Sequence, residues 1–205
     1  MTDFATPTVS RLRRTGRLLA IALLCLGALP TAWSGPEEEA AKSIFLVATG
    51  RLEGTSFQRT VILMTHMGGR VGTTGLAINR TTDVLLRDAF PNIPTLRESD
   101  ETLFLGGPVS PGTIFVLQRS EVPVQGMLRL VQDIYFAPGE QILARPAMGP
   151  RRAYAGYVGW APGQLQVEIE RGDWRVIRRD PGIVFAQDPN GLWDRLTGYR
   201  EGNWI

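Results

Sequence analysis

Short apolar runs, closed by glycine, proline or polar residues, dominate the chain from residue 43 onward. Runs of this length with turn residues at their ends are typical of buried β-strands. The pattern predicts strands over residues 43–49, 61–65, 74–79, 102–105, 114–118, 127–136, 154–158, 174–177 and 183–187. We expect residues 102–105 and 114–118 to pair with each other across a tight turn at residues 106–112.

Helical signals are fewer and shorter than the strand signals. Thr81 or Thr82 is expected to cap a helix over residues 83–90, which Pro91 ends. A single helical turn is expected over residues 140–144, and a closing helix over residues 192–196.

The segment from Pro162 to Arg171 is ambiguous by pattern alone. Leu165, Val167 and Ile169 alternate as in a strand, yet Leu165 and Ile169 also fit one face of a helix. Pro162 at the start and Gly172 just beyond the end favour a helix.

The composition fits one globular core. The chain has 205 residues, of which 43% are hydrophobic and 20% charged. Many strands, few helices and no internal repeat predict an α+β fold, a single domain over residues 43–205 built on a curved or closed sheet. The sequence contains no run of 18 apolar residues, so no conventional membrane-spanning helix is expected.

The first 34 residues differ from the rest. A basic segment containing Arg11, Arg13, Arg14 and Arg17 precedes an apolar segment at residues 18–30, and small residues follow before Gly35. This order predicts a signal peptide cleaved near Ser34, followed by a polar lead-in at residues 35–42, and therefore a periplasmic or secreted protein. Two alternatives remain open: a membrane anchor formed by residues 18–30, or a cytoplasmic protein whose start codon lies further downstream.

Cleavage would change the charge of the protein. Residues 1–34 contain four of the 22 basic and one of the 20 acidic residues, so residues 35–205 carry a net charge near −1. The sequence pI of about 9.0 is thus no argument for nucleic-acid binding. Cys25, the only cysteine, would leave with the signal, so neither a disulfide nor a cysteine metal site is expected.

A series of motifs between residues 43 and 200 resembles the YqgE/AlgH family. The motifs are Phe45-Leu46-Val47-Ala48, Phe57 with Arg59-Thr60-Val61, Gly75-Leu76-Ala77-Ile78-Asn79-Arg80, Gly106-Gly107-Pro108-Val109 with Phe115-Val116-Leu117, and Gly156-Tyr157-Val158-Gly159-Trp160 with Gly163-Gln164-Leu165, Glu168, Trp174 and Trp193. The resemblance implies an α+β fold around a six-stranded, mostly antiparallel barrel-like sheet. It implies no established enzymatic activity, although some members carry a regulator label.

The chain departs from the family pattern at several positions. Thr49-Gly50 stands where Met-Pro is usual, Thr81 where Pro is usual, and Gln118 where His is usual. A family function that depended on that histidine would not transfer to this chain. The export segment is also atypical of a family that is mostly cytoplasmic.

Seven residues are the candidates for a functional surface: Asn79, Arg80, Gly106, Gly107, Trp160, Gln164 and Glu168. On a helix, Gln164 and Glu168 share a face, and Trp160 would wall a cleft beside them. A buried carboxylate with an arginine can serve in acid/base chemistry. The alternative is a structural network in which Glu168 pairs with Arg80 or Arg171, and this alternative is favoured.

Other candidate sites carry weaker signals. Gly106-Gly107 is either a nest of backbone N–H groups for an anion or a turn that needs positive φ, and the turn is favoured. His66 is the only histidine, so no zinc site is expected, and it is interpreted as a polar residue at a strand end. No catalytic residue, metal or cofactor is therefore assigned.

Three functions remain open from the sequence. The preferred hypothesis is an exported, non-enzymatic binding or regulatory protein whose partner is an envelope protein or a second copy of itself. The alternatives are a hydrolase-type enzyme that uses Glu168 and Arg80 in a cleft, and a transcription regulator. No helix-turn-helix or basic helix is found, so nucleic acid is not a favoured partner.

Overall fold

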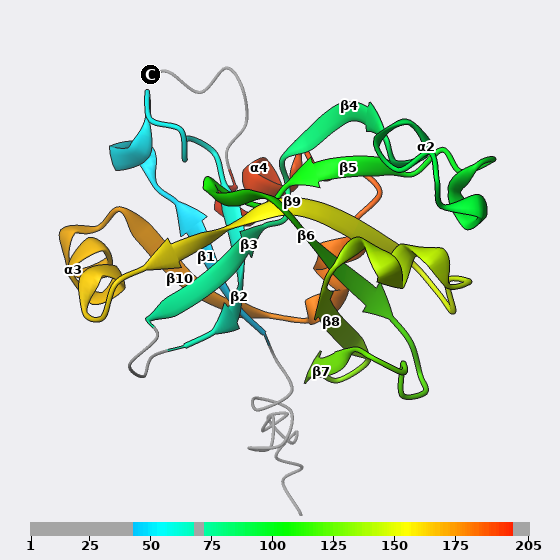
Figure 1. Cartoon of the computed structure of the whole chain (residues 1–205). Helices are drawn as coiled ribbons and strands as arrows, with labels where there is room; N and C mark the ends of the chain where they lie inside the picture. The colour runs from blue at the N-terminus through cyan, green and yellow to red at the C-terminus, as the bar shows by residue number, and fades with distance from the viewer. Residues whose placement is uncertain (1–42, 68–71, 199–205) are drawn as a thin grey trace, which may run out of the picture. The chain divides into compact units, whose positions relative to one another are not determined.

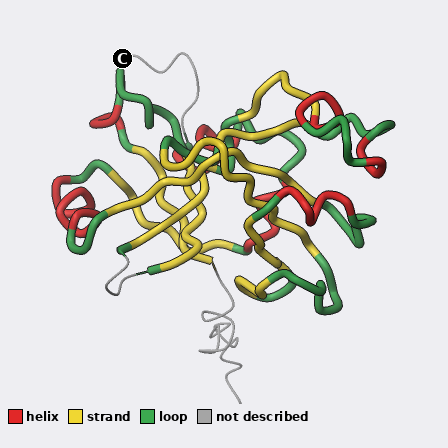
Figure 2. The backbone as a smooth tube through the Cα atoms, in the orientation of Figure 1, coloured by secondary structure: helices red, strands yellow, loops and turns green. Residues whose placement is uncertain are grey.

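The computed structural model describes residues 43–67 and 72–198, and the expected signal peptide and lead-in lie outside these residues (Figures 1 and 2). The strands are β1 (Ser43–Ala48), β2 (Val61–His66), β3 (Thr73–Ala77), β4 (Thr81–Leu85), β5 (Thr102–Leu105), β6 (Val109–Arg119), β7 (Leu128–Val131), β8 (Ile134–Pro138), β9 (Arg151–Trp160) and β10 (Trp174–Arg179). The α-helices are α2 (Leu86–Ala89), α3 (Gln164–Arg171) and α4 (Leu192–Thr197), and 3-10 turns are η1 (Gly50–Leu52), η2 (Pro94–Leu96), η3 (Glu140–Ala144) and η4 (Pro181–Phe185).

The strands form one curled, mostly antiparallel sheet, and strand β9 is shared by its two halves (Figure 1). The order is β10-β1-β2-β3-β9-β6-β8-β7, and β5 with β4 branches from β9. The expected α+β domain on a curled sheet is therefore confirmed, with ten strands where the family resemblance implied six.

Strand β9 changes partner along its length. Along one edge it pairs antiparallel with β6; along the other it pairs first with β5 at residues 153–155, in parallel, and then with β3 at residues 158–160. Gly156 lies between the two stretches and adopts a positive φ of 68°. Glycine weakens the interior of a strand, and the change of partner explains why one is present here.

Gly106 lies between β3 and β9 at the point where these strands diverge. Its N–H donates to the carbonyl of Ala155 at 2.8 Å, and its carbonyl accepts from the N–H of Ala77 at 2.8 Å. A Cβ atom at Gly106 would approach the carbonyl oxygen of Gly156 to 2.2 Å, and one at Gly107 would approach the backbone of Tyr157 to 2.2 Å. Both glycines are therefore required by the close approach of two backbones.

Alternation along the strands builds apolar layers on both faces of the sheet. In β1, Phe45 contributes to a core inside the curl, whereas Leu46 packs on the opposite face with Trp160 and Trp174. A third cluster covers the other half of the sheet, beneath η2 and η3, and includes Leu96 and Leu143. Burial on both faces explains why the strand sequences appear as continuous apolar runs.

Most expected elements are present, including the helix after Pro162. Helix α3 spans Gln164–Arg171, and Gly172 ends it in the left-handed region with φ of 86°. The N–H of Gly172 bonds the carbonyl of Ile169, which satisfies one of the last carbonyls of the helix. The strand-like stretch at residues 127–136 is a hairpin of β7 and β8.

Three expectations were wrong. Residues 81–85 form strand β4, which pairs with β5, so the helix expected over 83–90 is reduced to α2. Residues 102–105 pair with β4 and β9, because Gly106 brings them to β9 before the chain reaches β6. Residues 183–187 do not form a strand, because Asp180 caps the 3-10 turn η4 through the N–H of Gly182 at 2.7 Å.

We predict that Gly106→Ala destabilises the protein strongly, because the new methyl group would meet the backbone of β9. The free energy of unfolding should fall by about 3 kcal/mol or more, measured by urea unfolding. Gly112→Ala is the matched control, since nothing lies within 4 Å of a Cβ atom there. Its effect should stay within about 0.5 kcal/mol. Equal effects of the two substitutions would contradict the role given to Gly106.

Candidate functional site

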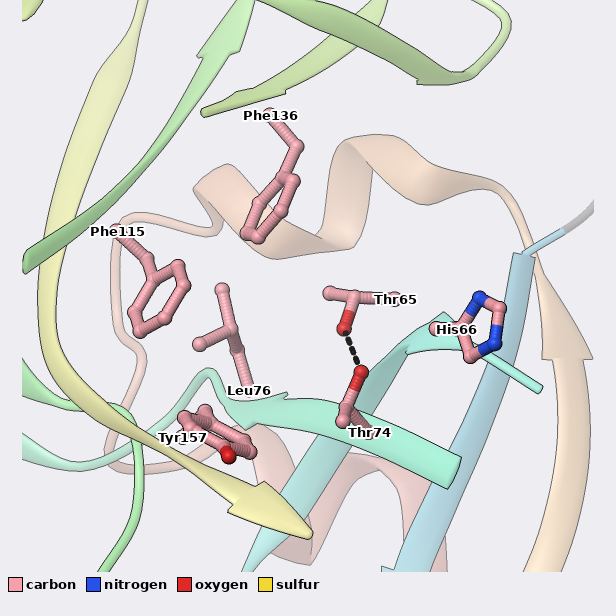
Figure 3. Close-up of a pocket in the computed structure, with 7 residues that line it drawn as sticks. All are labelled: Thr65, His66, Thr74, Leu76, Phe115, Phe136 and Tyr157. Carbon is pink, nitrogen blue, oxygen red and sulfur yellow. Dashed lines mark hydrogen bonds between the residues drawn. The ribbon is translucent and has the colours of Figure 1, made fainter. Parts of the chain in front are cut away.

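A pocket of about 200 Å³ opens between the β2–β3 and β6–β8 parts of the curled sheet. We call it the mouth pocket. Its lining residues are Thr65, His66, Thr74, Leu76, Phe115, Phe136 and Tyr157 (Figure 3). The residues come from five different strands, so the pocket depends on how the sheet curls and not on one local motif.

Aromatic rings form one side of the mouth pocket. Phe115 and Phe136 stack with ring centroids 5.6 Å apart and planes 9° from parallel. Tyr157 meets the edge of Phe115 at 5.7 Å and 76°. These rings are only partly buried, so their geometry leaves apolar surface facing the pocket.

Hydroxyl groups and His66 form the other side (Figure 3). The hydroxyl groups of Thr65 and Thr74 are hydrogen-bonded to each other at 3.0 Å, and each retains capacity to accept a further bond. His66 ends β2 with an exposed side chain. A second hollow of about 240 Å³ shares Thr65 and His66 and extends towards Ile44 and Leu130.

A separate pocket of about 270 Å³ lies beside Arg80, in the turn after β3. The guanidinium donates from Nη1 to the carbonyl of Ser56 and to Oγ1 of Thr60, the latter at 3.3 Å. Asn79, just before it, is buried, and its side-chain amide bonds the N–H of Val61 at 2.8 Å and the carbonyl of Arg59 at 2.9 Å. Asn79 thus fixes the turn that carries Arg80.

Glu168 on α3 accepts hydrogen bonds from two buried tryptophans. Its Oε2 accepts from the indole N–H groups of Trp160 and Trp174, each at 2.8 Å, and its Oε1 accepts from Nε2 of Gln164 at 2.9 Å. The two indoles meet edge to face at 6.2 Å. Gln164 also accepts from the N–H of Ala161 at 3.1 Å, which joins α3 to the end of β9.

The seven candidate residues therefore lie in three places. Trp160, Gln164 and Glu168 belong to one cluster with Trp174, which we call the tryptophan cluster. Arg80 and Gly107 line the Arg80 pocket. Gly106 and Asn79 form hydrogen bonds to neighbouring backbone segments. The expected pairing of Glu168 with Arg80 or Arg171 was wrong, because both its oxygens are occupied by other donors. Arg171 pairs with Asp173 instead, and its hydrogen bond is the main cause that lowers the pKa of Asp173.

Within residues 43–67 and 72–198, no group of three or more His, Cys, Asp or Glu side chains is arranged to hold a metal ion. No helix in the same part of the chain is both long enough and apolar enough to cross a membrane. Some carboxylates form ion pairs that tie segments together, such as Glu101 with the largely buried Arg151 at 2.9 Å.

Comparison with known proteins decides the family. The family model described as AlgH-like matches residues 45–204, which is most of the chain. The chain belongs to the AlgH-like family. The resemblance to the YqgE/AlgH family is thus confirmed.

Similar proteins occur in several bacteria. A UPF0301 protein of Streptomyces coelicolor is 34% identical over 172 residues, covering 77% of this chain and 86% of the relative. One from Methylococcus capsulatus is 32% identical over 158 residues, covering 73% and 86%. The solution structure of the AlgH protein from Pseudomonas aeruginosa superposes with a TM-score of 0.61 at 25% identity, covering 81% of this chain and 89% of that one. A Corynebacterium diphtheriae protein gives a TM-score of 0.63 at 26% identity, covering 80% and 88%. These names state no reaction or ligand, so membership of the AlgH-like family establishes no activity.

The residues that were expected to depart from the family pattern have defined places in the structure. Thr49 caps η1 by accepting from the N–H of Arg51 at 3.2 Å, and its hydroxyl donates to the carbonyl of Gly172 at 2.7 Å. Thr81 shares a hydrogen bond with Asn190 at 2.9 Å. Gln118 is buried in β6, and its Nε2 has no hydrogen-bond partner among the described residues.

The mouth pocket was missed from the sequence. Its three aromatic residues, Phe115, Phe136 and Tyr157, lie in apolar strand segments that resemble core segments. No local signal in the sequence distinguishes a ring buried in the core from a ring that lines a pocket. His66 was recognised as a strand-end residue, but its neighbours in the pocket come from strands far away in the chain.

We predict that Glu168→Gln destabilises the fold, because the amide NH₂ would face either an indole N–H or the amide of Gln164. The free energy of unfolding should fall by about 2 kcal/mol in urea unfolding. Glu170→Gln is the control on the same helix, since Glu170 is exposed and accepts only from Gln166 at 2.8 Å. Its change should stay below about 0.5 kcal/mol. If Glu168→Gln were as mild as the control, the tryptophan cluster would not depend on this carboxylate.

Proposed function

We propose that the protein acts by binding, without chemistry, and that the mouth pocket receives one aromatic ring of its partner. The observation that carries the proposal is the wall formed by Phe115, Phe136 and Tyr157, which offers both a stacking face and ring edges. The hydroxyls of Thr65 and Thr74 lie on the opposite side. A phenol ring matches this arrangement, because its face is apolar and its hydroxyl can donate to a threonine.

The size of the mouth pocket supports a single ring and not a large cofactor. Its volume of about 200 Å³ is below the range of roughly 300–1,000 Å³ that is typical of cofactor and drug-sized sites. A tyrosine side chain of another protein is an occupant of suitable size. Tyrosine is also enriched at protein interfaces, where it supplies a large rigid contact.

The hydrolase alternative has less support. Glu168 already accepts three hydrogen bonds, two of them from buried indoles, so freeing it as a base would break the tryptophan cluster. Arg80 donates to Ser56 and Thr60 and does not contact Glu168. The two groups that the hydrolase hypothesis requires therefore belong to different sites.

We also propose that the protein is exported, as its first 34 residues indicate, and that its partner is an envelope protein or a second copy of this chain. The support is the order of basic, apolar and small residues before Gly35. Export would exclude the transcription-regulator alternative, since the protein would have no access to the chromosome.

The binding proposal predicts that p-cresol, which is the tyrosine side chain without its backbone, occupies the mouth pocket. A titration followed by ¹H–¹³C NMR should shift the ring signals of Phe115, Phe136 and Tyr157, with a Kd on the order of 1 mM, as expected for so small a ligand. Phe136→Ala should weaken p-cresol binding by about fivefold or more, because it removes half of the stacked pair.

Phe90→Ala serves as the control for this titration. Phe90 is also partly buried, but it packs against the cluster beneath η2 and η3 and lines no part of the mouth pocket. Its affinity for p-cresol should be unchanged. The proposal would be refuted by the absence of ring shifts at saturating p-cresol, or by equal losses in the two variants.

The export proposal predicts a mature protein that begins near Gly35. Intact-mass measurement on separated periplasmic and cytoplasmic fractions should detect that species in the periplasm. A full-length or internally started species in the cytoplasm would overturn the localisation and return cytosolic partners to consideration.

A further inference from the structure

We propose that the Arg80 pocket is a second binding site, whose ligand is a carboxylate carried on a compact apolar body. This site shares no lining residue with the mouth pocket, so it stands independently of the proposed function. Its walls come from the loop before β2, from the end of β3 and the turn after it, and from the end of β5 with Gly107 and Pro108 just beyond it.

The charge of Arg80 is not neutralised by a carboxylate among the described residues. Its side chain is only partly exposed. Its two protein acceptors, the carbonyl of Ser56 and the hydroxyl of Thr60, are both neutral and both bind Nη1. A guanidinium has five N–H donors in a planar fork, so the Nε and Nη2 side remains for an anion.

Hydrogen bonds hold the turn that carries Arg80 in place. The backbone carbonyl of Arg80 accepts from the N–H of Leu105 at 2.9 Å, and the preceding Asn79 bonds the backbone on both sides of Thr60. Ser56 holds the guanidinium itself. The group is therefore positioned before a ligand arrives, which reduces the ordering cost of binding.

The other walls of the Arg80 pocket are mostly apolar. Phe57 is held edge to face against Trp174 at 5.8 Å, and Leu105, also in the lining, is 47% exposed. Pro108 and Gly107 complete the lining and carry no polar side chain. A single fork in an apolar hollow of about 270 Å³ fits one carboxylate attached to a hydrocarbon group of about the size of a benzene ring.

Benzoate and its neutral isostere benzamide test the charge requirement directly, because they differ only in the carboxylate. In ¹H–¹⁵N NMR titrations of the protein at low salt, benzoate should shift the amides of Leu105 and Gly107. The affinity of benzamide should be lower by about tenfold or more, since it cannot form a charge-assisted bidentate pair. Equal binding of the two ligands, or shifts confined to other regions, would overturn the proposal.

Two variants locate the site, and a third controls for general charge. Arg80→Gln should reduce benzoate affinity by about tenfold or more, and Arg80→Lys by less, because lysine keeps the charge without the fork. Arg87→Gln removes an arginine that is paired with Asp100 at 2.8 Å and should leave binding unchanged. Unchanged benzoate affinity in Arg80→Gln would refute the site.

A further variant keeps the test valid if Arg80→Gln disturbs the fold through Ser56. Leu105→Trp fills the pocket from its exposed wall and leaves Arg80 intact, so it should abolish the benzoate shifts while the spectrum stays folded. Retained binding in this variant would contradict the proposed location.

A carboxylate of this kind is found at a protein C-terminus and in a small free acid, and one comparison distinguishes these two sources. A dipeptide ending in phenylalanine with a free C-terminus is titrated beside benzoate. Binding that is about tenfold tighter than that of benzoate would indicate a protein C-terminus, and weaker binding a small free acid.

Discussion

The structure depends on the close approach of two backbones at Gly106 and Gly156. Here β3 and β9 separate, and a single residue, Gly106, bonds to both of them through its N–H and its carbonyl. Side chains larger than hydrogen do not fit, because a Cβ atom at Gly106 would lie 2.2 Å from a carbonyl oxygen of β9. This contact allows β9 to pair with β5 along one stretch and with β3 along the next, so both halves of the sheet share one strand.

Both pockets follow from this change of partner. The curl of the sheet brings Thr65 and Thr74, from one half, opposite Phe115 and Phe136, from the other, which forms the mouth pocket. On the other side of the branch point, Leu105 and Gly107 meet Arg80 and the loop before β2. Helix α3 extends the chain directly from the end of β9, and its Glu168 ties Trp160 of that strand to Trp174 of β10. The motif-rich stretch from Tyr154 to Trp174 thus mainly stabilises the fold, and Tyr157 is its one residue in the lining of either pocket.

The sequence allowed much of the fold to be predicted, because apolar runs and glycine or proline signals are local. Helix α3 was expected from Pro162 and Gly172, and the curled α+β sheet from the many short strand signals and from the family resemblance. Strand β4 was not expected, because Thr82 and Asp83 resemble the start of a helix. The pairing of β4 with β5 overrides this local preference, and such pairing is not visible in the local sequence. The site was less predictable still. Arg80 was recognised, but Glu168 was paired with the wrong groups, since no sequence pattern indicates that two indoles converge on one carboxylate.

The most direct test of this account is native-state hydrogen exchange at the amides of Ala77 and Gly106, measured by NMR. If the two halves are joined through these hydrogen bonds, both amides should exchange only through global unfolding, with the same opening free energy as the core amides of β1 and β2. Exchange of Gly106 through a local opening of much lower free energy, with the β1 and β2 amides still protected, would show that the halves separate independently and would contradict the account.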